Sequence, residues 1–255
     1  KEDVLTTMLN SAIMKLLRKG ENCPLEAGNY RSISLLSVFY KIGSGCITRR
    51  LETVMEKIIG PQQKAYSSTR NIGSILLNLL NMMDHVNKKK KESLILLVDF
   101  KKAFDSINTK FIDSALELFN FGESFRKWVR LFFSGRKTYL LLHGYLGDCI
   151  NLEQGVPQGD VLSPYIFNIC EEILLLKICF TNTLTGVKFA KREARAECFA
   201  DDTTVFIERT EENLRALVKI IEDFARISGL NASLDKTMVC PLGRNFSIKE
   251  DDQMC

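Results

Sequence analysis

Three aspartates have neighbours that suit metal-dependent chemistry. Asp99 follows the apolar residues 94–98, and Asp201 and Asp202 lie about a hundred residues later between two strand-like runs. Adjacent carboxylates raise each other's pKa unless a cation neutralises them. Mg²⁺ prefers such oxygen ligands and completes its coordination with water and phosphate. If Asp99 faces the pair across neighbouring strands, the three side chains can hold two metal ions for nucleotidyl transfer.

An adjacent aspartate pair also has a plain explanation, because aspartate favours turns for purely conformational reasons. The secondary structure around the pair therefore decides between a plain turn and a metal site. Residues 94–98 form a continuous apolar run, typical of a strand that is buried on both faces. Residues 197–200 and 203–207 predict two short strands, which would place Asp201 and Asp202 at the tip of a hairpin.

Other elements follow from hydrophobic periodicity and from helix start and stop signals. Helices are expected at residues 5–17, 38–59, 72–86, 109–121, 126–133, 165–177 and from Thr210 to Gly229, and paired strands at 138–142 and 149–152. Ser163 and Pro164 are a strong helix start, a capping serine followed by proline in the first turn. Strands and long helices in this order indicate an antiparallel α+β protein.

Three segments occur in an order that is far more specific than any of them alone. They are VDFKKAFD at 98–105, QGVPQGDVLSP at 154–164 and FADD at 199–202. Together they resemble the reverse transcriptases of non-LTR, LINE-like retrotransposons. Residues 29–36, 62–70 and 229–236 also resemble segments of that family, and the likeness extends from about residue 13 to 243.

The resemblance implies a metal site and a leaving-group acid. Asp99, Asp201 and Asp202 match the metal ligands, assisted by the main-chain carbonyl of Phe100. Lys236 matches the lysine proposed to protonate the departing pyrophosphate. Without the family, Phe100 would be read as a core residue and Lys236 as a solvated surface charge.

The resemblance also implies nucleotide and nucleic-acid contacts. Phe104 matches the aromatic residue that excludes a 2′-hydroxyl, and Arg31 matches the arginine that pairs with the triphosphate. Gln158 and Gly159 lie in a turn where the amide can bond a sugar or base and the backbone can approach a ligand. Arg70 is a candidate for template or primer phosphate.

Several of these assignments have alternatives. Phe104 would otherwise be a core residue, and Gln158 part of a plain surface turn. Either Arg18 or Lys19 is a candidate to assist Arg31. The lysine run at 88–91 is a second candidate for phosphate contact, although such a run is usually a solvated face.

The sequence departs from the family pattern in three places. Ser32 stands where the family normally has proline after the arginine, which predicts a less rigid loop. Asn10 and Ser11 join two segments that a longer stretch usually separates. No helical thumb, Cys/His knuckle or endonuclease segment follows the lysine, so we expect the thumb to be absent.

Composition narrows the class of protein without deciding its function. The 255 residues are 45% hydrophobic and 26% charged, with a net charge of +4, as in an ordinary globular protein. The apolar run at 94–98 is far shorter than the roughly 20 residues that cross a bilayer. None of the eight cysteines has CxxC spacing, which argues against a zinc site and favours a reducing compartment. We expect an intracellular location, nucleus or cytoplasm.

The sequence therefore predicts an α+β right-hand polymerase fold of fingers and palm, with an antiparallel palm sheet and flanking helices. The fingers would cover about residues 1–92, the palm about 93–243 and a tail 244–255. The expected cofactors are two Mg²⁺ ions, with Mn²⁺ as an alternative, and the expected partners are an RNA template, a DNA primer and deoxynucleoside triphosphates. An inactive remnant that retains nucleic-acid binding and an RNA-dependent RNA polymerase stay open as alternatives, as does the oligomeric state.

Overall fold

The structure, a computed structural model, describes residues 10–20, 26–66, 69–89, 91–189 and 192–243. The chain folds into two compact units. The first unit comprises Lys1–Gly60, Lys101–Ile173 and Phe224–Leu230, and the second comprises Pro61–Phe100, Leu174–Asp223 and Asn231–Cys255. No helix among the described residues is long and apolar enough to cross a membrane. The division into fingers, palm and tail stays a prediction.

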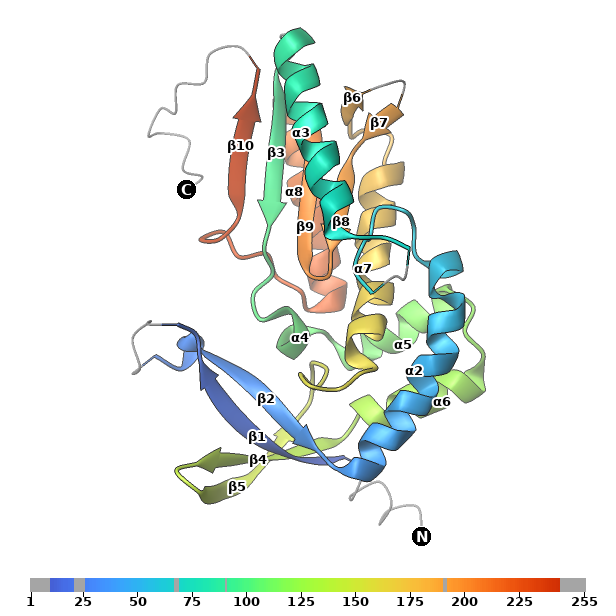
Figure 1. Cartoon of the computed structure of the whole chain (residues 1–255), viewed down its shortest axis with the longest axis vertical. Helices are drawn as coiled ribbons and strands as arrows, with labels where there is room; N and C mark the ends of the chain where they lie inside the picture. Colours follow the sequence, from blue (N-terminus) through green and yellow to red (C-terminus); the bar gives the residue numbers. More distant parts are fainter. Residues whose placement is uncertain (1–9, 21–25, 67–68, 90, 190–191, 244–255) are drawn as a thin grey trace. The chain divides into compact units, whose positions relative to one another are not determined.

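A four-stranded sheet belongs to the first unit, in the order β2-β1-β4-β5 (Figure 1). Its strands are β1 (Ser11–Arg18), β2 (Tyr30–Leu36), β4 (Arg136–Leu142) and β5 (Tyr145–Leu152). β1 pairs antiparallel with β2 and parallel with β4, and β4 and β5 form the hairpin expected from the sequence.

The helix predicted at residues 5–17 is wrong where the structure describes it. Ser11–Arg18 is a strand, and residues 5–9 lie outside the described residues. Short apolar runs fit both helical and strand patterns, so periodicity alone cannot separate them. Here the pairing of β1 with a strand on each side decides the conformation.

Helices of the first unit follow the predicted pattern, except for the four-residue helix at Ala103–Ser106, which was not predicted. They are α2 (Val38–Ile58), α4 (Ala103–Ser106), α5 (Thr109–Leu118), α6 (Glu123–Phe133) and the first part of α7 (Ser163–Phe180), with a short 3-10 turn η1 (Ala27–Asn29). Ser37 caps α2 by accepting a hydrogen bond from the Tyr40 amide at 3.1 Å. The Tyr40 ring packs edge-on against Phe132 at 4.9 Å, and both side chains are buried. α5 ends a few residues before the predicted Phe121.

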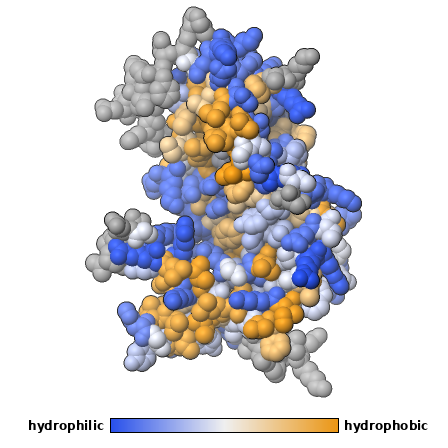
Figure 2. Space-filling view, viewed as in Figure 1, coloured by the Kyte–Doolittle hydropathy of each residue, from blue (hydrophilic) through white to orange (hydrophobic). Residues whose placement is uncertain are grey.

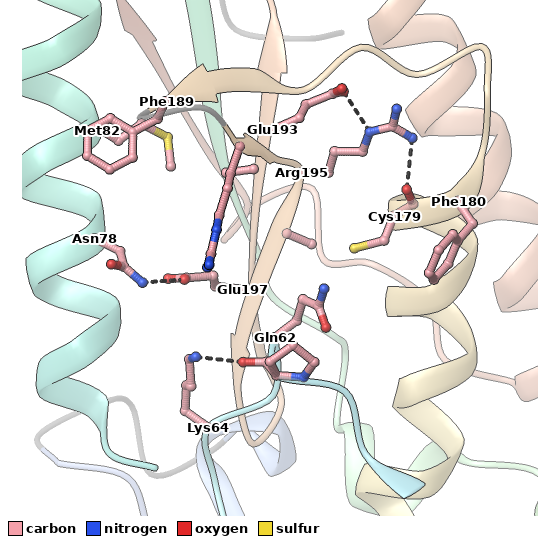
Figure 3. A pocket seen from close by; sticks show the side chains of 14 residues that line it. Gln62, Lys64, Asn78, Met82, Cys179, Phe180, Phe189, Glu193, Arg195 and Glu197 are labelled. Carbon is pink, nitrogen blue, oxygen red and sulfur yellow. Dashed lines mark hydrogen bonds and ion pairs between the residues drawn. The ribbon is translucent and has the colours of Figure 1, made fainter. Parts of the chain in front are cut away.

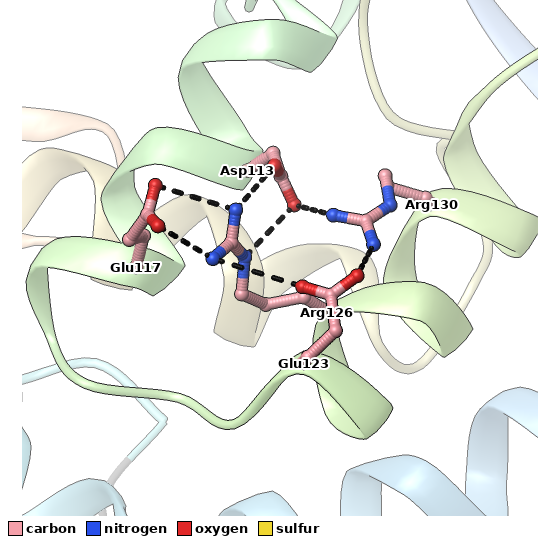
Figure 4. A network of polar contacts seen from close by, with 5 residues as sticks. All are labelled: Asp113, Glu117, Glu123, Arg126 and Arg130. Carbon is pink, nitrogen blue, oxygen red and sulfur yellow. Dashed lines mark hydrogen bonds and ion pairs between the residues drawn. The ribbon is translucent and has the colours of Figure 1, made fainter.

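A network of charged side chains connects α5 and α6 (Figure 4). Arg126 lies 2.7 Å from Asp113 and 2.9 Å from Glu117. Arg130 lies 2.6 Å from Asp113 and also pairs with Glu123. The hydrogen bonds from Arg126 are the main reason why the pKa of Asp113 lies below its usual range.

The second unit contains an antiparallel sheet in the order β10-β3-β9-β8. Its strands are β3 (Ser93–Val98), β8 (Ala196–Phe199), β9 (Asp202–Glu208) and β10 (Met238–Leu242), and a small hairpin pairs β6 (Val187–Phe189) with β7 (Arg192–Ala194). β3 is buried along its length except at Leu97, as the apolar run predicts. The mostly antiparallel sheets and the flanking helices confirm the α+β prediction.

Helix α3 (Ile72–Lys89) packs on this sheet through Met82 and Val86, which contact Ile95 of β3 and Phe206 of β9. Figure 2 shows apolar side chains on the outward face of α3, where Leu76, Leu77 and Leu80 are exposed. Helix α8 (Glu211–Ser228) begins after Thr210, whose hydroxyl accepts a hydrogen bond from the Asn213 amide at 3.2 Å. It ends before Gly229, which has φ +80°, as predicted.

Candidate active site

The antiparallel register brings Asp99 beside the aspartate pair. Val98, at the end of β3, pairs with Thr203 of β9. Asp99 follows Val98 and Asp202 precedes Thr203, so both lie at the same end of the sheet. The second unit therefore brings together, as predicted, Asp99 and the aspartate pair, which lie about a hundred residues apart in the sequence.

The turn between β8 and β9 has an unusual backbone. Phe199 pairs with Asp202, which leaves Ala200 and Asp201 as the turn residues of the predicted hairpin. Ala200 has φ 57°, in the left-handed region that residues other than glycine rarely adopt. This conformation costs about 1 kcal/mol or more for a residue with a Cβ atom, so the surrounding contacts must hold it.

Electrostatic repulsion is visible within this group. Burial raises the pKa of Asp202, and the charges of Asp201 and Asp99 raise it further. Oδ2 of Asp99 is buried and has no hydrogen-bond partner in the described part of the chain. The Lys236 ammonium lies 3.2 Å from this oxygen, within ion-pair range but without hydrogen-bond geometry. A cation therefore already stands beside one of the carboxylates.

Lys236 reaches Asp99 because its segment is tied to the end of β3. The Ser233 amide donates a hydrogen bond to the Asp99 carbonyl at 2.7 Å. The Lys236 amide in turn donates to the Ser233 carbonyl at 3.1 Å. Phe100 forms an isolated antiparallel bridge with Ala232, and its side chain is buried, so the side chain itself serves the core.

These carboxylates suit a divalent metal ion by chemistry. Asp99 offers a buried oxygen without a hydrogen bond, and the pKa of Asp202 is raised first by burial and then by the neighbouring carboxylates, both of which a cation would offset. Within the described ranges, however, no three carboxylate, imidazole or thiol groups converge closely enough to hold one ion. The chemistry of the donor set therefore fits a divalent metal ion.

The predicted nucleotide-binding turn belongs to the first unit and is held by Asp105. Gln158 Nε2 donates a hydrogen bond to Asp105 Oδ1 at 3.0 Å, and the Ser32 hydroxyl lies 3.2 Å from Oδ2. The Ser34 amide donates to the Gln158 carbonyl at 2.9 Å. Gly159 has φ +105°, which explains why glycine is required at this point of the turn.

Phe104 lies in the same unit, half-buried and stacked on Phe167 with ring centroids 4.8 Å apart. Its carbonyl accepts a hydrogen bond from the Val156 amide at 2.6 Å. Arg31 is an exposed residue of β2, opposite Leu17 of β1. The Phe104 ring thus packs against another aromatic ring, as a core residue does. The Arg31 side chain is accessible to a ligand.

A family model described as reverse transcriptase (RNA-dependent DNA polymerase) matches residues 17–247, which is most of the chain. The chain belongs to the reverse transcriptase family. Reverse transcriptases generally use divalent metal ions, which agrees with the oxygen-rich character of the aspartate cluster.

Individual relatives confirm the predicted non-LTR type of this reverse transcriptase. The Pol polyprotein of a type-2 retrotransposable element from Drosophila melanogaster is 28% identical over 208 residues, which are 82% of this chain and 19% of the relative. The RNA-directed DNA polymerase of the mobile element jockey from Drosophila funebris is 26% identical over 203 residues, 78% of this chain and 21% of the relative. The chain thus spans about a fifth of the length of these relatives.

Solved structures of telomerase share the fold. Apo telomerase from Candida tropicalis, truncated from its C-terminal domain, aligns with a TM-score of 0.66 at 13% identity, over 94% of this chain and 51% of that chain. The same telomerase in complex with a TWJ fragment of telomeric RNA gives a TM-score of 0.69 at 13% identity, over 94% and 42%. This likeness confirms the fingers-palm fold and carries no more than the fold.

Arg70 of the reverse transcriptase has an internal partner. Its Nη1 donates a hydrogen bond to the Gln63 carbonyl at 3.0 Å, and the side chain is half-buried. This contact orients the guanidinium group of Arg70. Its contact with a template or primer phosphate stays a prediction.

Sequence reasoning did not assign three residues that hold candidate site segments within their own units. Asp105 fixes Gln158, Gln63 contacts the Ala200 turn, and Arg136 donates hydrogen bonds to the carbonyls of Gln154 and Gly155 at 2.7 and 2.8 Å. Arg136 is buried, which is rare for an arginine. A prediction of burial from the sequence is the only approach that could have drawn attention to it. Asp105 at least lies inside the VDFKKAFD motif.

A separate cavity of about 770 Å³ lies in the second unit (Figure 3). α3, β7, β8 and the end of α7 line it, and Asn78 donates a hydrogen bond to Glu197 at 2.7 Å on its wall. Arg195 is tied to the carbonyls of Cys179 and Thr181 at 2.9 and 2.7 Å. The aspartate cluster does not line this cavity.

Proposed function

We propose that this chain is the polymerase core of a non-LTR retrotransposon reverse transcriptase, which extends a DNA primer on an RNA template with deoxynucleoside triphosphates. The observation that carries the proposal is the position of Asp99 and the pair Asp201 and Asp202 at one end of an antiparallel sheet. Membership of the reverse transcriptase family supports the reaction type.

Asp99, Asp201 and Asp202 would hold two Mg²⁺ ions, or Mn²⁺ in their place, with the Phe100 carbonyl assisting. When bound, the ions activate the primer 3′-hydroxyl and stabilise charge on the departing pyrophosphate. The buried, hydrogen-bond-free oxygen of Asp99 supports this assignment. The raised pKa of Asp202 supports it too, because a nearby cation would restore its charged form.

Lys236 would protonate the leaving pyrophosphate. Its side chain is 64% exposed and its ammonium lies beside Asp99, so it is both accessible to a ligand and close to the proposed metal ligands. With Asp99 holding a metal ion, the Lys236 ammonium would be available to the triphosphate.

Nucleotide selection would rest on residues of the first unit. Phe104 would exclude the 2′-hydroxyl, Gln158 and Gly159 would contact the nucleotide, and Arg31 would pair with its triphosphate. Arg70 would contact template or primer phosphate. An RNA template agrees with the description of the matching family as RNA-dependent DNA polymerases. An intracellular location, in the nucleus or the cytoplasm, is part of the proposal.

Primer extension tests the proposal. The 255-residue chain would be given an RNA template, a DNA primer and Mg²⁺, with deoxy- and ribonucleotides offered separately. Asp202→Ala should abolish extension, because a proposed metal ligand is lost. Asp148→Ala, the same change at an exposed residue of β5, should leave extension intact.

The outcomes separate the competing functions. Deoxynucleotide extension that depends on Asp202 supports a reverse transcriptase. Preference for ribonucleotides would favour an RNA polymerase and overturn the role of Phe104. Absence of extension by the folded chain would favour an inactive remnant.

A further inference from the structure

Gln63 is a fully buried polar side chain beside the Ala200 turn. Its Oε1 accepts hydrogen bonds from the Ala200 amide at 3.1 Å and from the Ala65 amide at 3.0 Å. Its Nε2 donates to the Ala200 carbonyl at 3.2 Å. The side chain has 0% exposure, so these bonds do not compete with water.

The backbone around Gln63 is itself paired with β8. The Cys198 amide donates to the Gln62 carbonyl at 3.0 Å, and the Lys64 amide donates to the Cys198 carbonyl at 2.8 Å. Gln63 and Cys198 form a parallel bridge. The segment therefore lies along the outer edge of β8 in a fixed register, which aims the Gln63 amide at the turn.

Ala200 needs such a partner for two reasons. Its left-handed backbone is unfavourable for alanine, and the turn must keep two like-charged carboxylates close together. A primary amide carries both an N–H donor group and a carbonyl acceptor, so a single Gln63 side chain bonds both the N–H and the C=O of Ala200. Gln63 thus bonds the backbone of Ala200 as a neighbouring β-strand would, and Ala200 directly precedes Asp201 and Asp202.

We propose that Gln63 is a positioning residue that holds the Ala200 turn and thereby sets the orientation of Asp201 and Asp202. The inference rests on the proposed function, since it concerns the geometry of the proposed metal ligands. Gln63 touches no substrate in this role, and it acts through the backbone of Ala200.

The test compares Gln63→Met with Gln62→Met. Methionine keeps the length of glutamine and removes both hydrogen-bonding groups. Gln62 is the adjacent residue, and its side chain lines the separate cavity, so the control makes the same chemical change next to the site without touching Ala200. Urea unfolding would establish that both variants are folded.

Amide hydrogen exchange at Ala200, measured by NMR, reads the contact directly and requires no activity. We expect exchange about tenfold faster in Gln63→Met than in wild type, because one hydrogen bond to this amide is lost, and no change in Gln62→Met. Equal exchange at Ala200 in both variants would overturn the inference. If Gln63→Met does not fold, Gln63→Glu replaces it in the kinetic comparison, since it keeps the acceptor for the Ala200 amide and loses the donor to the Ala200 carbonyl.

Kinetics distinguish positioning from general support of the fold. We expect Gln63→Met to lower kcat about tenfold and to raise the Mg²⁺ concentration needed for half-maximal rate, while KM for primer and template stays within about twofold. An unchanged kcat and Mg²⁺ requirement, in an active wild type, would refute the positioning role. If the wild type itself does not extend primers, the proposed function fails and the exchange at Ala200 still decides whether Gln63 holds the turn.

Discussion

Replacing Gly155 with alanine should damage the nucleotide-binding loop through one close backbone approach. Gly155 has φ +81°, and a Cβ atom there would lie 2.7 Å from the Asp105 carbonyl oxygen and 2.8 Å from the Phe104 carbonyl oxygen. The same loop is bonded to residues 104–107, because the Gly155 amide donates to the Ile107 carbonyl at 2.7 Å. The added methyl group would therefore push apart two segments that these bonds hold together.

The magnitude follows from two costs. A left-handed alanine costs about 1–2 kcal/mol, and forcing atoms into a packed interior adds about 1–3 kcal/mol. Gly155→Ala should thus lower the free energy of unfolding by roughly 2–5 kcal/mol. Gly144→Ala is the matched control, because Gly144 has φ +87° and open space around its would-be Cβ, so only the conformational cost of about 1–2 kcal/mol applies.

Urea unfolding of both variants, followed with the same probe, measures the difference. The KM for deoxynucleotide should rise in Gly155→Ala and stay unchanged in Gly144→Ala, because only the first displaces Phe104 and Asp105. Equal destabilisation by the two substitutions would refute the reasoning, since it would mean that the close approach contributes nothing.

Three further substitutions test the site and its charges. Asp105→Ala should raise the deoxynucleotide KM about tenfold, because Gln158 loses a hydrogen bond to a charged group worth about 1.5 kcal/mol. Asp113→Asn should reduce the loss of stability on acidification. The pKa of Asp113 is lowered by Arg126, so its contribution is present above the unfolded pKa and lost as pH falls. Asp160→Asn should stabilise the protein more at pH near 8 than near 4. Burial raises the pKa of Asp160, so its favourable contribution is present in acid and lost as pH rises.

Each of these has a measurement that can contradict it. For Asp105→Ala, steady-state kinetics with an unchanged KM would show that Gln158 needs no anchor. Urea unfolding across pH tests the two charge predictions. Parallel pH profiles for wild type and Asp113→Asn would contradict the first, and an Asp160→Asn variant that is less stable than wild type at pH near 8 would contradict the second.

Local signals in the sequence were enough for much of the fold. The apolar run at 94–98 predicted a strand buried on both faces, and β3 is buried except at Leu97. Turn and capping residues act within a few positions along the chain, so they can be recognised without any knowledge of the remainder. The hairpin that carries Asp201 and Asp202, the cap at Thr210 and the end of α8 at Gly229 were predicted for this reason.

Contacts between distant segments were decided only by the tertiary structure. β1 is a strand because β2 and β4 flank it, although its own periodicity also fits a helix. Gln63 gives no local sign of its role, and Asp105 gives only its place in the VDFKKAFD motif, since a glutamine or aspartate is ordinarily a surface residue. Their partners, Ala200 and Gln158, lie 137 and 53 positions away along the chain.

The aspartate site shows the boundary between the two kinds of information. The sequence alone determined that Asp99 ends a strand and that Asp201 and Asp202 lie at a hairpin tip, because strand and turn preferences are properties of short segments. Only the register of β3 against β9 decided that these carboxylates lie at one end of one sheet. Register depends on which faces the whole sheet buries, and no short segment contains that information.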